Sequence, residues 1–369
     1  MSSKNFPIED ILRLYNAPNV GPATFISFVE EFGSPAEVFR RSAGELCAIK
    51  RINTDRASAI LSSDSSEFIS SQLALIERTG CKMVSYWDDE YPQRLKTIFD
   101  PPPFYFIRGE LIEEDDYALA VVGTRGVTSY GKLMTEKLVT ELAREGLTIV
   151  SGLASGVDSI AHKAALAIGG RSIGVLGSGS DRIYPQENTG LAKSLSEKGA
   201  LISEFPMGTA PDRGNFPQRN RIISGLSLGT LVIEGDVKSG ALITAYYAVD
   251  QNREVFALPG NATSKMSRGP HRLIRTGAKL VTSAEDILSE LDSIVERGRK
   301  PKQTKLVFDF SPDEQTIMEV LDSEPLYIDE IAERCSIATS QALGTLLGLE
   351  LRSLVRQLPG KMFISLVHN

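Results

Sequence analysis

The feature that most constrains the fold is a series of short apolar segments, each followed by a turn and a helical pattern. These segments are ALAVVG (118–123), LTIVSG (147–152), SIGVLG (172–177), ALISEF (200–205), LVIEG (231–235), EVFALPG (254–260) and KLVT (279–282). Continuous apolar strands that alternate with helices are typical of a parallel sheet buried on both faces. Residues 80–295 are therefore predicted to form a doubly wound α/β domain, with further strands at 81–85 and 104–107.

Residues 1–75 are predicted to form an all-α domain. Ile8, Ile11, Leu12 and Tyr15 recur at helical spacing, and the turn from Pro18 to Pro22 leads into a second helical pattern. This arrangement is similar to a SAM or helix-hairpin-helix module, in which the turn directs backbone N–H groups at a DNA phosphate. A packing or partner-docking module is the alternative, because the turn lacks the usual glycine on both sides of its apolar residue.

The C-terminal part of the chain has a different pattern. Residues 296–310 are predicted to be a basic linker, and residues 311–369 indicate three helices and a glycine-containing hairpin, as in a winged helix. Its third helix contains one cation, Arg352, which favours protein contact over reading of a DNA groove. This division predicts that a fragment of about 80–295 folds without the flanking segments.

Composition limits the class of protein and partner. The 369-residue chain has a net charge of −7, so a nucleic-acid partner would have to be held by a local basic patch. No signal pattern and no apolar run of membrane-spanning length is present, which predicts a cytoplasmic protein without membrane contact. The three cysteines and three histidines are scattered, so no metal site is predicted.

Glycine-containing turns follow the first two strands of the main series. Gly123, Thr124 and Arg125 leave the first strand, and Ser151 and Gly152 leave the second. Glycines let the backbone approach a ligand closely, and the helix N-termini that follow favour an anion, so the predicted ligand is phosphate. Neither GxGxxG nor GxxxxGK[ST] is present, and no dinucleotide or nucleotide cofactor is predicted.

An aromatic residue and a cluster of polar residues, at 216–221, lie at the start of the helix that precedes the strand at 231–233. Ligands of such sheets collect at the carboxyl ends of the strands, so these residues are predicted to face a phosphodiester groove together with the start of the next helix. The alternative is a solvated basic face. The predicted groove contains Gly123, Thr124, Arg125, Ser151, Gly152, Phe216, Arg219, Asn220, Arg221, Lys238, Ser239 and Gly240, with Tyr184 as a further stacking face.

Asp158 and His162 lie four residues apart and could form a general-base pair. We interpret both as structural, because no nucleophile with a third orienting group occurs at a recognisable spacing. No catalytic residue is predicted.

The run from Tyr91 to Leu291 resembles the DNA-processing protein A family, DprA, also called Smf. The blocks that carry this resemblance are YPQRL (91–95), PPFYFIRG (102–109), VVGTRGVTSYG (121–131), SGLASGVDSIAH (151–162), SEFPMG (203–208), NFPQRNRIISGLS (215–227), VIEGDVKSGALITA (232–245) and VFALPG (255–260). The resemblance implies an extended Rossmann-like domain at residues 80–295, and a protein that is not an enzyme. It implies a homodimer that binds and protects single-stranded DNA and delivers it to the RecA recombinase in natural transformation. Arg125, Arg219 and Arg221 match the family's basic positions.

An enzyme is the competing class. Ser227-Leu228-Gly229-Thr230 followed by Glu234 is similar to the GGxGTxxE element of the lysine-decarboxylase-like nucleotide phosphoribohydrolases. The first glycine pair of that element is replaced here, and Glu234 lies one position late.

Overall fold

The computed structural model describes residues 6–298, 311–321, 325–352, 354–358 and 360–365. The chain divides into two compact units, Met1–Val295 and Glu296–Asn369. Most of the predicted basic linker, residues 299–310, lies outside the described residues.

The first unit is built on a nine-stranded sheet with the order β1-β2-β6-β5-β4-β3-β7-β8-β9. Strands β3 to β9 are parallel, whereas β2 runs antiparallel to β6 and β1 antiparallel to β2. The doubly wound sheet predicted from the apolar segments is confirmed. The strands are β1 (Lys82–Ser85), β2 (Phe104–Gly109), β3 (Ala118–Val122), β4 (Thr148–Ser151), β5 (Ser172–Val175), β6 (Ala200–Ser203), β7 (Gly229–Val232), β8 (Glu254–Ala257) and β9 (Lys279–Leu280).

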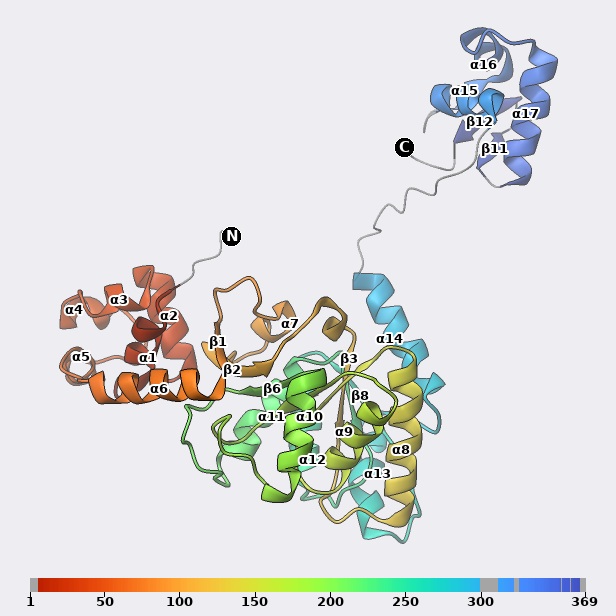
Figure 1. Ribbon diagram of the computed structural model, residues 1–369. Coiled ribbons are helices and arrows are strands. Elements are labelled where there is room, and N and C mark those ends of the chain that lie inside the picture. The colour runs from red at the N-terminus through yellow and green to blue at the C-terminus, as the bar shows by residue number, and fades with distance from the viewer. Residues whose placement is uncertain (1–5, 299–310, 322–324, 353, 359, 366–369) are drawn as a thin grey trace. The chain divides into compact units, whose positions relative to one another are not determined.

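Alternate residues of each strand enter separate cores on the two faces of the sheet. In β3, Ala118 and Ala120 face one core and Leu119 and Val121 the other, as the two-residue strand period requires. The first core is closed by α7 (Gln93–Lys96), α11 (Asn215–Gly225), α12 (Gly240–Asp250) and α13 (Arg268–Arg275). The second is closed by α8 (Ser129–Arg144), α9 (Val157–Ala167) and α14 (Glu285–Gly298), and α10 (Thr189–Lys198) packs beside β6 (Figure 1).

The N-terminal segment is all-α, as predicted, and it shares a core with the sheet. Its helices cluster beside β1 and β2 in Figure 1. Phe104 and Phe106 of β2 are 1% and 0% exposed because they pack into the core of these helices, while Tyr105 and Ile107 face the core of the sheet. The helices are α1 (Ile8–Asn16), α2 (Pro22–Phe32), α3 (Pro35–Val38), α4 (Ala43–Leu46), α5 (Thr54–Leu61) and α6 (Ser66–Thr79).

This shared core bears on the predicted boundary near residues 75–80. The N-terminal helices and the sheet lie in one compact unit, and Met207 joins the two Phe residues in the core of the helices. The boundary therefore stays a prediction, and a fragment that begins at residue 80 would expose this apolar surface to water.

The second unit has the winged-helix arrangement predicted from the sequence. Helices α15 (Pro312–Val320), α16 (Ile328–Arg334) and α17 (Thr339–Leu351) pack with a three-stranded sheet in the order β10-β12-β11. Its strands are β10 (Leu326–Tyr327), β11 (Val355–Leu358) and β12 (Met362–Ser365). Helix α15 begins at a capping box, in which Ser311 and Glu314 bond to each other's backbone N–H groups.

Helix α17 exposes Leu343 and Leu347 on its surface. Over all the residues that the structure describes, no helix combines the length and apolar character needed to cross a lipid bilayer.

Candidate nucleic-acid interface

The candidate interface lies at the carboxyl ends of β3, β4 and β7. After β3 the chain adds β4, β5 and β6 on one side, and then returns to place β7 on the other side of β3. Such a reversal opens a crevice between the loops that leave the two neighbouring strands. A pocket of about 360 Å³ lies there, lined by Val122, Gly123, Thr124, Arg125, Ala154, Asp158, Phe216, Arg219, Asn220, Ile223, Ser239, Gly240, Ala241 and Thr244.

A smaller pocket next to it brings in the loop after β5. Its lining is Arg125, Gly152, Ala154, Ser155, Tyr184, Pro185 and Phe216. The rings of Tyr184 and Phe216 lie with centroids 5.8 Å apart, and the Arg125 guanidinium carbon lies 5.5 Å from the centroid of the Phe216 ring. Arg125 is exposed and Tyr184 is 43% exposed, so a cation and two aromatic faces meet at a surface that solvent reaches.

The turn that presents Arg125 is fixed by backbone contacts. Thr124 N–H donates to the Glu234 carbonyl at 2.8 Å, and its own carbonyl accepts from Val157 N–H at 3.3 Å. Gly156, at φ +84°, fits against this turn, because a Cβ there would lie 2.4 Å from the Thr124 carbonyl oxygen. The two turns therefore interlock, and the position of the Arg125 backbone is set by packing rather than by a ligand.

Arg219 lines the floor of the pocket and is only 4% exposed. One of its terminal nitrogens donates to the Gly152 carbonyl at 2.7 Å and to the Val175 carbonyl, and Nε donates to the Asn220 Oδ1 at 3.1 Å. Two of these partners are backbone carbonyls at strand ends, so Arg219 joins β4 and β5 to α11. The sequence predicts that Arg219 is a cation exposed in a DNA-binding groove, whereas in the structure its side chain is almost completely buried.

Asp158 lies beside the Arg219 guanidinium. Its carboxylate accepts from Gly152 N–H at 3.1 Å and from Ala154 N–H at 3.4 Å. Burial raises the pKa of Asp158 to about 6, although the charge of Arg219 and these hydrogen bonds act to lower it. The turn after β4 thus holds the carboxylate by two hydrogen bonds, close to the charge of Arg219, in agreement with its interpretation as structural.

Arg221 does not reach the pocket. It is 4% exposed and pairs with the Glu204 carboxylate, with Asp100 at 3.7 Å. Residues two apart on an α-helix point about 200° away from each other, so Arg219 and Arg221 of α11 face different surroundings. The sequence prediction placed both arginines in one groove, and for Arg221 the structure does not support this placement.

Of the remaining predicted residues, some line a pocket and others are engaged elsewhere. Ser151 is buried and donates to the Val121 carbonyl at 2.6 Å, so its hydroxyl joins two strands. Lys238 is exposed but is not among the lining residues of either pocket. Ser239 caps α12 by accepting from Ala241 N–H at 3.4 Å, and it also lines the larger pocket.

Sequence reasoning did not select several small residues that line the two pockets. Ala154, Ser155, Ala241 and Thr244 lie within the blocks at 151–162 and 232–245, but their small side chains gave no chemical reason to select them. Because these side chains are small, the space beside the Phe216 ring stays open, whereas a bulkier side chain would fill it. Their position after glycine turns or in the first turns of helices is the signal that could have found them.

Glu234 and His162 are both engaged inside the fold. The Glu234 carboxylate is 3% exposed and accepts from Thr128 N–H at 2.9 Å and from the Thr128 hydroxyl at 2.6 Å. His162 lies 2.7 Å from the Ser172 hydroxyl through Nδ1, and burial lowers its pKa to about 3. Neither group is in a position to transfer a proton at the pocket.

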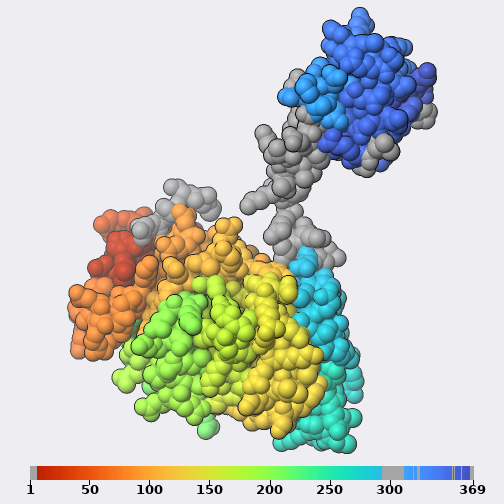
Figure 2. Space-filling view, turned by 45° about the vertical axis from the view of Figure 1, so that its right-hand side comes forward, coloured from red at the N-terminus to blue at the C-terminus, as the bar shows by residue number. Residues whose placement is uncertain are grey.

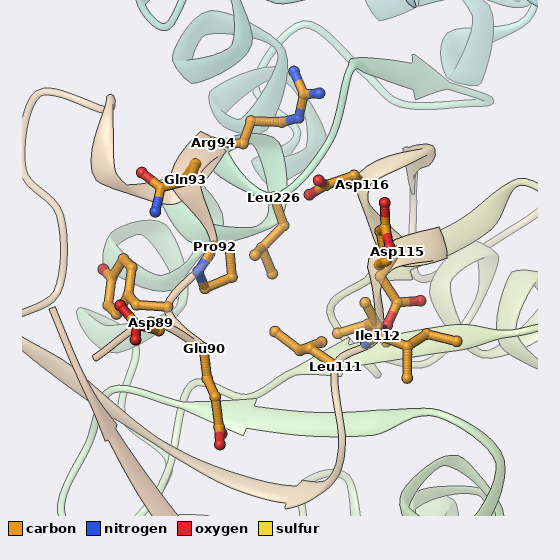
Figure 3. Close-up of a pocket in the computed structure, with 13 residues that line it drawn as sticks. Asp89, Glu90, Pro92, Gln93, Arg94, Leu111, Ile112, Asp115, Asp116 and Leu226 are labelled. Atoms are coloured by element: carbon orange, nitrogen blue, oxygen red, sulfur yellow. Dashed lines mark hydrogen bonds between the residues drawn. The ribbon is translucent and has the colours of Figure 1, made fainter. Parts of the chain in front are cut away.

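A further pocket of about 260 Å³ lies away from these strand ends, near the starts of β5 and β7 (Figure 3). Its interior is faced by Pro92, Leu111 and Leu226, and carboxylates surround it, including Glu90 and Asp116. Such a rim repels phosphate, so this pocket is a poor candidate for nucleic acid. The described residues contain no group of three or more His, Cys, Asp and Glu side chains arranged to hold a metal ion.

Two family models match the chain. Residues 82–292 match the family model described as DNA recombination-mediator protein A. The chain belongs to the DNA processing protein A family. Residues 300–361 match the DprA winged helix domain.

Members of this family are similar to the chain over most of its length. Protein Smf of Escherichia coli is 41% identical over 300 residues, which cover 79% of each protein. DNA processing protein DprA of Bacillus subtilis is 46% identical over 220 residues, 59% of this chain and 74% of the relative. The crystal structure of DprA from Streptococcus pneumoniae aligns with a TM-score of 0.69 and 34% identity, over 78% of this chain and 99% of that one.

A Helicobacter pylori DprA structure, described by its single-stranded DNA binding mode, aligns with a TM-score of 0.52 and 28% identity. That alignment covers 59% of this chain and 96% of the other.

Proposed function

We propose that this chain binds single-stranded DNA at the pocket formed by Arg125, Phe216 and Tyr184, and protects incoming DNA during natural transformation. The observation that carries the proposal is the exposed Arg125 guanidinium beside two neighbouring aromatic rings. Proteins that bind single strands combine a cation for the backbone with aromatic faces for the bases. Family membership and the binding mode described for the Helicobacter pylori relative support the same function.

The contacts suit any base sequence. A guanidinium recognises phosphate through forked donors, and an aromatic ring stacks on any base because every base has a π-face. Asn220 is the one amide that lines the larger pocket, and its Oδ1 already accepts from Arg219. We therefore expect only slight sequence preference.

Two substitutions separate the roles of Arg125 and Phe216. In Arg125→Gln, one phosphate contact is lost, so the slope of log affinity against log salt should fall by roughly 0.7. In Phe216→Ala, stacking worth about 1–3 kcal/mol per base is lost and the slope should stay unchanged. Fluorescence anisotropy with oligo-dT over a salt series measures both quantities.

Arg144→Gln is the matched control, since Arg144 is exposed in the last turn of α8 and lines neither pocket. It should leave affinity and slope close to the wild type. Wild-type affinity and slope in both Arg125→Gln and Phe216→Ala would contradict the proposed site.

The proposal extends to two partners. As the resemblance to this family implies, we expect the chain to form a homodimer through its central domain, predicted at residues 80–295, and to deliver DNA to the RecA recombinase. Sedimentation velocity over a concentration series tests the first expectation, and a monomer at every concentration would contradict it.

We propose a binding protein rather than a phosphoribohydrolase. In the enzyme interpretation, Glu234 would act on a nucleotide, yet its carboxylate already accepts two hydrogen bonds from Thr128 at the start of α8. A general acid or base needs to be within hydrogen-bond reach of its substrate. The contacts of Glu234 favour a role in holding the turn that carries Arg125.

A further inference from the structure

We propose that Arg78, Arg108 and Arg182 form a second phosphate-binding site, which extends the path of the single strand beyond Tyr184. This inference rests on the proposed single-stranded DNA function. The three arginines, with Thr79 and Asp181, line an open depression of about 550 Å³. The site is separate from the pocket at Arg125, and the predicted groove did not include it.

The three arginines come from segments that are far apart in the sequence and meet in the fold. Arg78 lies in the last turn of α6, Arg108 is in β2, and Arg182 belongs to the loop that follows β5. Arg108 donates to the Ser180 carbonyl at 3.4 Å, which holds this loop against β2. In the space-filling view of Figure 2, the orange part of the first unit adjoins its green and yellow-green parts on one face.

The depression carries an excess of positive charge. Asp181 is its one carboxylate, and it accepts from Gly208 N–H at 2.7 Å while lying 3.7 Å from Arg182 Nε. Within residues 6–298, neither Arg78 nor Arg108 has a carboxylate at ion-pair distance. Three guanidinium groups opposed by one engaged carboxylate attract an anion, and their forked donors match phosphate.

The two sites are connected along one loop. Arg182 precedes Tyr184 by two residues, and the Tyr184 ring lies against Phe216 and thus near Arg125. A strand stacked on Tyr184 would therefore continue toward Arg182, with Arg108 and Arg78 beyond it. No aromatic residue lines the depression, so this outer site holds the backbone by charge and leaves the bases uncontacted.

The inference gives the N-terminal helices a contact with DNA. The sequence prediction considered the turn from Pro18 to Pro22 for such a contact, by analogy with helix-hairpin-helix modules. Arg78 instead lies at the other end of this segment, in the last turn of α6, next to the loop of Arg182.

Oligonucleotides of two lengths test the outer site. A triple variant, Arg78→Gln, Arg108→Gln and Arg182→Gln, should bind oligo-dT of about 5 nucleotides as the wild type does, because a strand of that length occupies the inner pocket alone. On oligo-dT of about 25 nucleotides, the slope of log affinity against log salt should fall by roughly 2, at about 0.7 for each lost contact. The full-length chain is used throughout.

A variant with the same change in net charge is the control. Lys137→Gln, Arg144→Gln and Lys163→Gln alter exposed cations of α8 and α9 and should change neither oligonucleotide's affinity. Because Arg108 is half-buried, Arg182→Glu serves as a second variant: its side chain is 63% exposed, so the fold should tolerate the change while binding of the long strand weakens.

The outcomes are distinct. Wild-type affinity and slope for the long strand in the triple variant and in Arg182→Glu would overturn the outer site while leaving the inner one intact. Equal losses for the short and the long strand would also overturn it as a separate site. If the wild type bound neither oligonucleotide, the proposed function itself would fail.

Discussion

Replacing Arg219 with alanine is expected to lower the free energy of unfolding by about 2–6 kcal/mol, because it leaves two buried carbonyls without their donor, at about 1–3 kcal/mol each. Arg219 is 4% exposed and lies beside Asp158, which is 7% exposed. Its removal leaves the Asp158 charge buried without a counter-charge and leaves the Gly152 carbonyl without its 2.7 Å donor. Urea unfolding of the full-length chain measures the loss.

The pH dependence of this loss has a definite sign. In the wild type, burial raises the pKa of Asp158 from 3.8 to about 6, and without Arg219 it should rise further. A carboxyl whose folded pKa lies above its unfolded value loses stability as pH rises through that interval. In Arg219→Ala the gap between the unfolded and the folded pKa of Asp158 is wider than in the wild type. The loss of unfolding free energy caused by the substitution should therefore be smaller at about pH 5 than at about pH 8.

Two companion variants isolate the cause. Arg213→Ala removes an exposed arginine just before α11 and should change the free energy of unfolding by less than about 0.5 kcal/mol. Asp158→Asn combined with Arg219→Ala removes the unpaired charge and should recover part of the loss. An Arg219→Ala variant as stable as Arg213→Ala would contradict the role given to this arginine. Weaker DNA binding by Arg219→Ala would reflect the damaged fold as much as any lost phosphate contact.

A fragment of residues 80–295 is expected to be far less stable than a fragment of residues 1–295. Truncation exposes Phe104, Phe106 and Met207, which are 1%, 0% and 4% exposed in the structure. Burying a side chain of this size is worth about 1.5–3 kcal/mol, so the loss should amount to several kcal/mol and favour aggregation. Thermal unfolding by circular dichroism and sedimentation measure the two effects.

This expectation differs from the one drawn from sequence, in which the central domain folds without residues 1–75, and the stability of the 80–295 fragment decides between them. A fragment of residues 1–295 is the control, because it coincides with one compact unit and should be as stable as the same unit in the full chain. Phe104→Thr with Phe106→Thr in the shorter fragment should restore solubility, since both lie on the face of β2 that truncation exposes. An unmodified 80–295 fragment that melts like 1–295 would refute the shared core.

Much of the fold could be predicted because the inner parallel strands, β3 to β7, are buried along their whole length and are mostly apolar. The segments at 118–123 and 147–152, for example, correspond to β3 and β4 and end in the predicted glycine turns. The shared core could not be predicted in this way. Phe104 to Ile107 is a continuous apolar run, and such a run does not reveal that its two faces belong to different groups of helices.

The candidate site was predictable in part. Gly123 and Arg125, which the sequence assigned to the predicted groove, line the pocket, because glycine turns at strand ends have a fixed place in this type of sheet. The arginines of α11 were not distinguished from one another. Whether a helical cation faces a pocket or a buried carboxylate depends on partners far away in sequence, such as Glu204 for Arg221, and no local pattern specifies them.

The face of β2 that carries Phe104 and Phe106 also sets an order of events during synthesis. The ribosome releases α1 to α6 first, but their core includes β2 and Met207, which are translated later. The nascent helices must therefore wait, with part of their apolar surface uncovered, until more than half of the chain has emerged. An N-terminal segment that resembles an independent module would thus complete its folding only after the first six strands of the sheet have been made.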